Sequence, residues 1–191
     1  TEPGKSVRLT LDARIQARAE DELADIGTKQ QARSATAIVM QPSTGQVLAL
    51  ASWPKIDAND PLSAPAEAQS IQGTHFTYEP GSTFKAFTVA GALQDGKVTP
   101  DTPFDLAPQI VVADRTIGES HPRGPERLTT AQILAQSSNV GAITIGQRLG
   151  AKRFDYWVRK FGFGKKTGVD LPGEERGLVL PVDKYSGSSM G

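Results

Sequence analysis

Two apolar runs on either side of a short turn constrain the fold of this chain more than any other feature. Residues Ala35–Met40 and Val47–Ala51 flank the turn Pro42-Ser-Thr-Gly45, and a turn of this composition between apolar segments is typical of an antiparallel hairpin. Both runs are nearly continuous rather than alternating, which is the pattern of strands covered on both faces. The sequence therefore predicts a hairpin with cover on each side.

Helical spacing appears on both sides of this hairpin. Asp12 is an expected N-cap for a segment in which apolar residues repeat every four positions, and Gly27 is the expected stop. Further helices are expected at Phe84–Leu93, on either side of a break at residues 137–139, and at Ala151–Phe161.

The remaining segments are expected to be extended or irregular. Residues 6–11 alternate between polar and apolar, as a half-buried strand does. A long loop is expected over residues 53–77, and a loop-rich region with one short strand, Ile110–Val112, over residues 97–127.

Composition excludes several classes of function. Lys plus Arg and Asp plus Glu each number 21 in the 191 residues, so the zero net charge argues against a nucleic-acid-binding protein. The chain has no cysteine, which excludes thiol catalysis, and His75 and His121 lie too far apart in sequence to suggest a metal pair. We expect neither a metal nor a cofactor. No run approaches the roughly 20 apolar residues of a membrane span, and the start, "TEPGKSVRLT", reads as the interior of a longer protein.

The stretch "EPGSTFKAF" carries the first candidate site. In a helix, Ser82 and Lys85 share one face, and Ser82 would lie in the first turn, whose unpaired N–H groups favour a developing negative charge. A lysine among apolar neighbours is partly desolvated, and desolvation favours its neutral, basic form. Serine needs such a base to become a nucleophile. On its own, however, the pattern also fits a helix cap beside a solvated lysine.

A second motif, Ser137-Ser138-Asn139, stands between two expected helices. A hydroxyl and an amide two residues apart can point the same way from a turn, where Ser137 would relay a proton and Asn139 would bind both a substrate carbonyl and Lys85. The alternative is an ordinary helix-capping sequence, for which Ser and Asn are common choices.

Together the two motifs resemble the Ser-x-x-Lys and Ser-x-Asn signature of penicillin-binding proteins and serine β-lactamases. Other phrases are similar to class B penicillin-binding proteins, the monofunctional peptidoglycan D,D-transpeptidases of cell elongation and division: "RLTLDARIQARAEDEL", "AIVMQPSTGQVLALAS", "YEPGSTFK", "SSNVG", "FGFGKKTGVDLPGE" and "SMG". The resemblance follows the family's order over nearly the whole chain.

The resemblance implies a fold and a set of roles. The fold would be an α+β (α/β/α) sandwich with an antiparallel sheet between helical layers. Ser82 would be the acylated nucleophile, Lys85 its general base, Ser137 a proton shuttle and Asn139 a substrate-binding residue. The backbone N–H of Ser82 would supply one oxyanion donor.

The family's third motif, Lys-Thr/Ser-Gly on a sheet strand, is spelled by Lys166-Thr167-Gly168. We reject this match, because glycines at 162, 164 and 168 indicate a loop and because the resemblance places the true motif later. Residues 1–191 are therefore expected to form the first part of a transpeptidase domain, incomplete at its C-terminus, with the membrane anchor preceding Thr1.

The resemblance also implies location and partners. The protein would act at the extracytoplasmic face of the cell membrane, on peptidoglycan stem peptides ending in D-Ala-D-Ala, with β-lactams as inhibitors and with proteins of a cell-wall synthesis complex as partners. Two alternatives remain at this point. One is a serine β-lactamase, although Glu174-Glu175-Arg-Gly lacks the Glu-x-x-x-Asn pattern of class A enzymes; the other is a non-catalytic β-lactam sensor or scaffold.

Overall fold

The computed structural model describes residues 4–57, 59–64 and 66–185. These residues fall into two compact units, one within residues 4–76 and 170–175 and the other within residues 77–169 and 176–185. The Ser-Met-Gly phrase at residues 189–191 lies outside the described residues.

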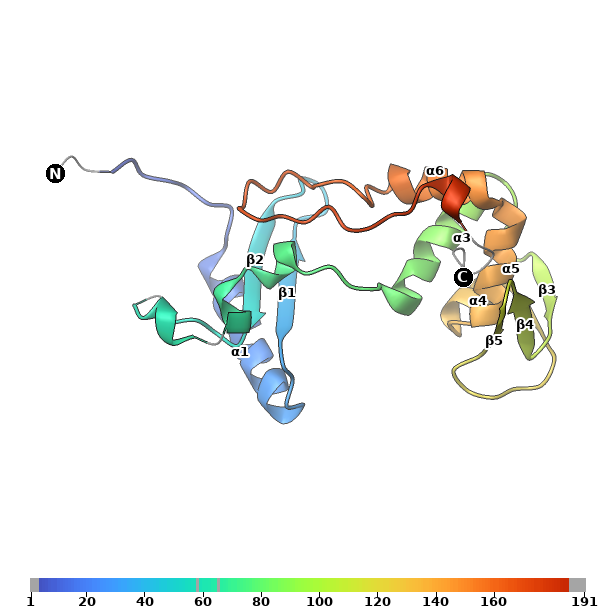
Figure 1. The fold of residues 1–191 in the computed structure, drawn as a ribbon, viewed down its shortest axis with the longest axis horizontal. Helices are drawn as coiled ribbons and strands as arrows, with labels where there is room; N and C mark the ends of the chain where they lie inside the picture. The colour runs from blue at the N-terminus through green and yellow to red at the C-terminus, as the bar shows by residue number, and fades with distance from the viewer. Residues whose placement is uncertain (1–3, 58, 65, 186–191) are drawn as a thin grey trace. The chain divides into compact units, whose positions relative to one another are not determined.

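The first unit contains the predicted hairpin and the first predicted helix (Figure 1). Its elements are α1 (Ala13–Lys29), β1 (Ala35–Met40), β2 (Val47–Trp53), the 3-10 turns Pro61–Ser63 and Ala66–Gln69, and α2 (Gln72–His75). Strands β1 and β2 are antiparallel, with Ile38 opposite Leu50 and an irregularity between Val39 and Met40. The hairpin is thus confirmed, but the expected cover on both faces is incomplete, because Ile38 and Met40 on one face of β1 are about half exposed.

Helices approach the hairpin on two sides. Gly73 in α2 lies so close to Leu50 and Ile38 that an added Cβ would be 2.9 Å and 3.1 Å from their side chains. Gly27 in α1 lies against Trp53 of β2. A Cβ added at Gly27 would be only 2.5 Å from the Cδ1 atom of the Trp53 indole. Ala49 and Ala51, which share a face of β2 with Trp53, are fully buried.

The sequence suggested that Gly27 ends the first helix, but α1 continues to Lys29. The residue is a glycine because the indole of Trp53 occupies the space of a side chain. The predicted cap is confirmed: the Asp12 carboxylate accepts hydrogen bonds from the backbone N–H groups of Arg14 (2.9 Å) and Ile15 (3.3 Å).

The predicted strand over residues 6–11 is wrong. Among the described residues no strand pairs with this segment, and Val7 and Leu9 are largely exposed. The segment is fixed near its end by hydrogen bonds from the Thr10 hydroxyl to the Val47 carbonyl and from the Asp12 N–H to the Leu48 carbonyl. An alternation of polar and apolar residues indicates an extended segment with two different faces. Such a segment forms part of a sheet only where a neighbouring strand pairs with it.

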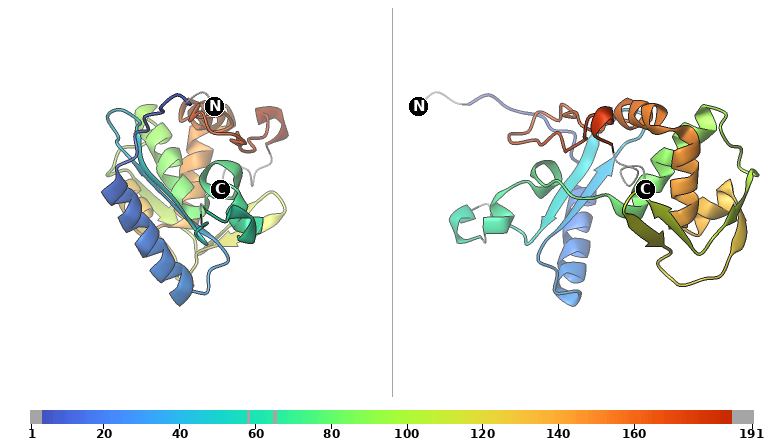
Figure 2. Two further views of the ribbon diagram at one scale, coloured as in Figure 1. Left: turned by 90° about the vertical axis from the view of Figure 1, so that its left-hand side faces the viewer. Right: turned by 45° about the vertical axis from the view of Figure 1, so that its right-hand side comes forward.

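The second unit consists of helices and two small antiparallel sheets (Figure 2). Its elements are the 3-10 turn Gly81–Phe84, α3 (Lys85–Gln94), β3 (Pro103–Leu106), β4 (Gln109–Val112), β5 (Arg115–Gly118), β6 (Glu126–Thr129), α4 (Thr130–Ala135), α5 (Asn139–Leu149), α6 (Ala151–Lys160) and the 3-10 turn Val182–Lys184. Strand β3 pairs with β6, and β4 pairs with β5. The helix predictions are confirmed, and so is the strand expected at Ile110–Val112, which is β4. The sequence missed three further strands, β3, β5 and β6, in and beside the region 97–127.

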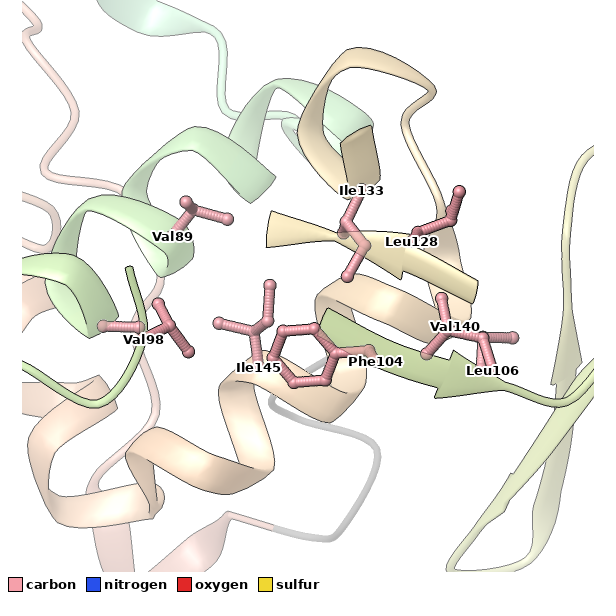
Figure 3. Close-up of a cluster of buried hydrophobic side chains, with 9 residues drawn as sticks. Val89, Val98, Phe104, Leu106, Leu128, Ile133, Val140 and Ile145 are labelled. Atoms are coloured by element: carbon pink, nitrogen blue, oxygen red, sulfur yellow. The ribbon is translucent and has the colours of Figure 1, made fainter. Parts of the chain in front are cut away.

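A buried apolar cluster joins these elements. Figure 3 shows side chains from α3, β3, α4 and α5 turned toward a common centre. Its buried members are Val89, Ala92, Val98, Phe104, Leu106, Leu128, Ile133, Val140 and Ile145. This cluster packs α3 together with α4 and α5, which brings the two predicted motifs into one unit.

Candidate active site

Ser82 lies in the 3-10 turn that leads into α3, next to a sharp bend in the backbone. Gly81 has φ of +57°, a conformation that glycine adopts without the penalty of a side chain. The Ser82 residue is exposed, so its hydroxyl is open to an approaching molecule. Lys85 begins α3 three residues later.

Lys85 connects the two motifs. Its Nζ donates hydrogen bonds to the Ser82 hydroxyl (3.2 Å), the Ser137 hydroxyl (3.0 Å) and the Asn139 Oδ1 (2.6 Å). The Ser137 carbonyl, at 2.6 Å, is a fourth acceptor. An ammonium group has three N–H donors, so these acceptors more than saturate it and hold it beside both serines.

Burial lowers the pKa of Lys85 below its ordinary value, and the negative charge of Glu119 partly opposes this shift. A lysine with a lowered pKa has a larger neutral fraction at physiological pH, and the neutral amine is the form that can accept a proton. The site therefore places a base within hydrogen-bonding distance of an exposed serine hydroxyl.

The second motif forms the turn between α4 and α5. Ser137 has φ of +56°, a left-handed conformation that costs a non-glycine residue about 1–2 kcal/mol. This bend directs both the carbonyl and the hydroxyl of Ser137 to Lys85. Strained backbone of this kind is common at functional sites.

Ser138 and Asn139 divide two tasks between them. The buried Ser138 hydroxyl accepts a hydrogen bond from the Gly141 N–H (2.9 Å) and caps α5. The Asn139 Nδ2 donates to the Gly118 carbonyl (2.9 Å), which leaves Oδ1 directed at Lys85. The capping interpretation of this motif is therefore correct for Ser138, while Ser137 and Asn139 meet Lys85.

Glu119 is a residue of this site that the sequence analysis missed. Its side chain is 8% exposed and accepts hydrogen bonds from the Ser138 hydroxyl (2.7 Å), the Asn139 N–H (2.6 Å) and the Val140 N–H (3.3 Å). Arg123 donates to the same carboxylate at 2.7 Å. Burial alone would raise the pKa of Glu119, but these hydrogen bonds outweigh it and the pKa is lowered.

Sequence offered little signal for Glu119, because it lies in a segment that was expected to be loop-rich and shares no short motif with Ser137–Asn139. The residue follows β5, and β5 lies beside α5. Only recognition of the β4–β5 hairpin could have suggested that residue 119 meets the start of α5.

The rejected match to the third motif is an irregular segment in the structure. Lys166, Thr167 and Gly168 are exposed and belong to no strand, which confirms that this segment is not the strand required for the third motif. Arg123 pairs with Glu119 and Glu126, and the exposed Arg127 pairs with Asp105.

In the described part of the chain, no group of three or more His, Asp or Glu side chains is placed to hold a metal ion. Within the same residues, no helix has both the length and the apolar character needed to cross a membrane.

Comparison with known proteins shows which protein family this chain matches. The model of the penicillin-binding protein transpeptidase domain matches residues 35–191. The chain is 34% identical over 188 residues to penicillin-binding protein PbpB of Mycolicibacterium smegmatis, covering 98% of this chain and 29% of the relative. It is 33% identical over 176 residues to the protein of Caulobacter vibrioides named "Probable peptidoglycan D,D-transpeptidase FtsI", covering 92% of this chain and 30% of the relative. The chain thus spans about 30% of the length of these curated relatives.

Solved structures give the same relationship. The apo form of penicillin-binding protein 3 from Mycobacterium tuberculosis matches with a TM-score of 0.89 and 32% identity, covering 95% of this chain and 41% of that one. The aztreonam complex of the same protein matches with a TM-score of 0.88, 32% identity and the same coverage. The fold is therefore that of part of a transpeptidase domain, with helices and antiparallel strands as expected.

Proposed function

Given that the chain belongs to the penicillin-binding protein transpeptidase family, we propose that it carries the nucleophile, base and second motif of a peptidoglycan D,D-transpeptidase. The observation that supports this most strongly is the position of Lys85 Nζ within 3.2 Å of both the Ser82 and Ser137 hydroxyls. A helix cap beside a solvated lysine would not require the four acceptors that surround this amine.

The reaction would proceed through an acyl-enzyme. Neutral Lys85 would take the hydroxyl proton of Ser82 as the Ser82 oxygen bonds to the penultimate D-Ala carbonyl of a stem peptide. The amide C–N bond would then break, and a proton delivered through Ser137 would allow D-Ala to leave as an amine. The amine of a second stem would attack the ester, forming the cross-link and returning the proton to Ser82.

Each remaining group would have a defined part in this reaction. The Ser82 N–H would donate to the developing oxyanion. Asn139 would bind the amide of the substrate with the Nδ2 hydrogen that does not bond to the Gly118 carbonyl. A β-lactam would acylate Ser82 in the same way, by opening its ring amide.

We further propose that residues 1–191 form the first part of a transpeptidase domain and that the third motif lies in later strands. The whole protein would act at the extracytoplasmic face of the cell membrane, in contact with proteins of a cell-wall synthesis complex. Crystals of a relative, penicillin-binding protein 3, contain aztreonam or ampicillin, which supports β-lactams as ligands.

Acylation and cross-linking test the proposal in the full-length protein. Intact-mass measurement with penicillin, followed by peptide mapping, should find the adduct on Ser82 and none in Ser82→Ala. An adduct on another serine would overturn the assignment of the nucleophile.

Product analysis with a lipid-linked peptidoglycan substrate separates the three functions. A transpeptidase forms cross-linked stems and releases D-Ala, a β-lactamase turns over penicillin rapidly, and a sensor is acylated but forms no cross-link. Rapid penicillin hydrolysis or the absence of cross-linked product would contradict the proposed reaction.

A further inference from the structure

Glu119 is a buried carboxylate that the proposed reaction does not use. A buried charge without partners is costly, but here the carboxylate accepts four hydrogen bonds, and three of them come from residues 138–140 at the start of α5. The N–H groups of Asn139 and Val140 belong to the first turn of α5, where the helix itself supplies no acceptor.

The neighbouring residue orients the Asn139 side chain. Because the Gly118 carbonyl accepts from Asn139 Nδ2, the amide cannot rotate without losing that bond, and its oxygen stays 2.6 Å from Lys85 Nζ. Gly118 and Glu119 therefore fix both the backbone and the side chain of Asn139. The β4–β5 hairpin, which lies beside α5 in Figure 2, carries these two residues to that place.

We propose that Glu119 is the positioning residue of this site, holding the start of α5 so that Asn139 and Ser137 meet the Lys85 amine. The inference rests on the proposed function, because it assigns Glu119 a part in the acylation of Ser82. Glu119 touches neither Ser82 nor Lys85 through a hydrogen bond in the structure, so its effect would pass through the second motif and through its charge.

The charge of Glu119 provides a readout that a merely structural role would not move. The carboxylate raises the pKa of Lys85 against the larger effect of burial. Removing its charge should lower that pKa further, so the acid limb of the acylation rate should move to lower pH. The charged groups near this carboxylate are Lys85 from α3 and Arg123 from its own loop, and Arg123 also pairs with Glu126.

The test compares Glu119→Gln with Glu126→Gln in the full-length protein. Both variants remove a carboxylate that pairs with Arg123, but only Glu119 contacts the second motif. The measurement is the second-order rate constant for acylation by a fluorescent penicillin as a function of pH, with thermal unfolding recorded in parallel. Glu119→Gln should lower the plateau rate about 10- to 100-fold, the range for hydrogen bonds to a charged group, and shift the acid limb to lower pH.

Glu126→Gln should change neither the plateau nor the limb. If Glu119→Gln acylates at the wild-type rate, or loses rate only in proportion to unfolded protein with the acid limb unmoved, the inference is wrong. Should Glu119→Gln fail to fold, Glu119→Asp keeps the charge with a shorter reach, so it should lower the plateau without moving the limb; an unchanged plateau would overturn the inference. A wild-type protein that is not acylated at Ser82 would instead contradict the proposed function.

Discussion

Lys85 and Lys166 both belong to short motifs that contain a hydroxyl residue, yet their surroundings in the structure differ. Lys85 is half-buried, begins a helix and has four acceptors around its amine. Lys166 is exposed in an irregular segment bounded by Gly164 and Gly168, both with φ of +81°. A short motif therefore says little about catalytic function until the helices, strands or loops that surround it are known.

The surroundings of Lys85 depend on residues that are distant in sequence. Lys85 meets Ser137 and Asn139, more than 50 residues away in sequence, because the cluster containing Val89 and Ile133 packs α3 against α4. Such packing excludes water from part of the amine and lowers its pKa.

The largest expected effect comes from removing each lysine in turn. Lys85→Ala should lower the rate of penicillin acylation about 10²–10⁴-fold, the contribution of general-base catalysis, while Lys166→Ala should leave it within a factor of about two. The measurement is the acylation rate of the full-length protein with a fluorescent penicillin. Lys85→Arg should behave like Lys85→Ala, since arginine stays charged; normal acylation by Lys85→Arg would show that a positive charge suffices.

Much of the hairpin and the helices could be predicted from sequence because their signals are local. The turn at Pro42–Gly45 and the cap at Asp12 involve neighbours in sequence, and both predictions hold. The pairing of Ser82 with Lys85 is likewise set by helical spacing, and their atoms lie 3.2 Å apart.

The predictions that failed depend on distant residues. Gly27 was expected to end a helix, but its role is set by Trp53 on another element. Residues 103–106 form a strand because they pair with residues 126–129, and four-residue strands have too little periodicity to be recognised alone. Glu119 was missed for the same reason, since its partners lie about 20 residues away on α5.

The next largest effect tests whether Lys166-Thr167-Gly168 can complete the site. If the third motif lies in later strands, a polypeptide ending at Gly191 should be acylated about 10²–10³-fold more slowly than the full-length protein, the cost of one lost oxyanion donor. The comparison uses a fluorescent penicillin at equal concentrations of folded protein, checked by circular dichroism. Equal rates would show that this half of the domain is sufficient and would make our rejection of the Lys166 motif wrong.

A smaller effect is expected from the amide that faces Lys85. Asn139→Ala removes one of the four acceptors around the amine and should slow acylation about 10- to 100-fold, the range for a hydrogen bond to a charged group. Gln136→Ala is the matched control, because Gln136 is exposed and precedes the same turn. Equal rates for both variants would mean that Asn139 does not hold Lys85 during acylation.

The smallest effect on acylation should come from Gly168→Ala. Among the described residues beyond its two chain neighbours, no atom lies within 4 Å of a Cβ added at Gly168. The substitution therefore introduces only backbone strain at φ of +81°, worth about 1–2 kcal/mol. Urea unfolding should report this loss while the acylation rate stays unchanged. Gly141→Ala is the contrasting variant, since its Cβ would lie 2.7 Å from the Ile133 side chain and overpacking of this kind costs about 1–3 kcal/mol.

Gly141 also lies two residues after Asn139, and its N–H donates to the Ser138 hydroxyl. A shift of α5 away from Ile133 would therefore move Asn139 relative to Lys85, so Gly141→Ala should slow acylation as well as destabilise the fold. If Gly168→Ala slowed acylation as much as Gly141→Ala at a similar loss of stability, the loop around Lys166 would have to belong to the site. The expectation that Lys85 belongs to the site of acylation and that Lys166 does not would then be wrong.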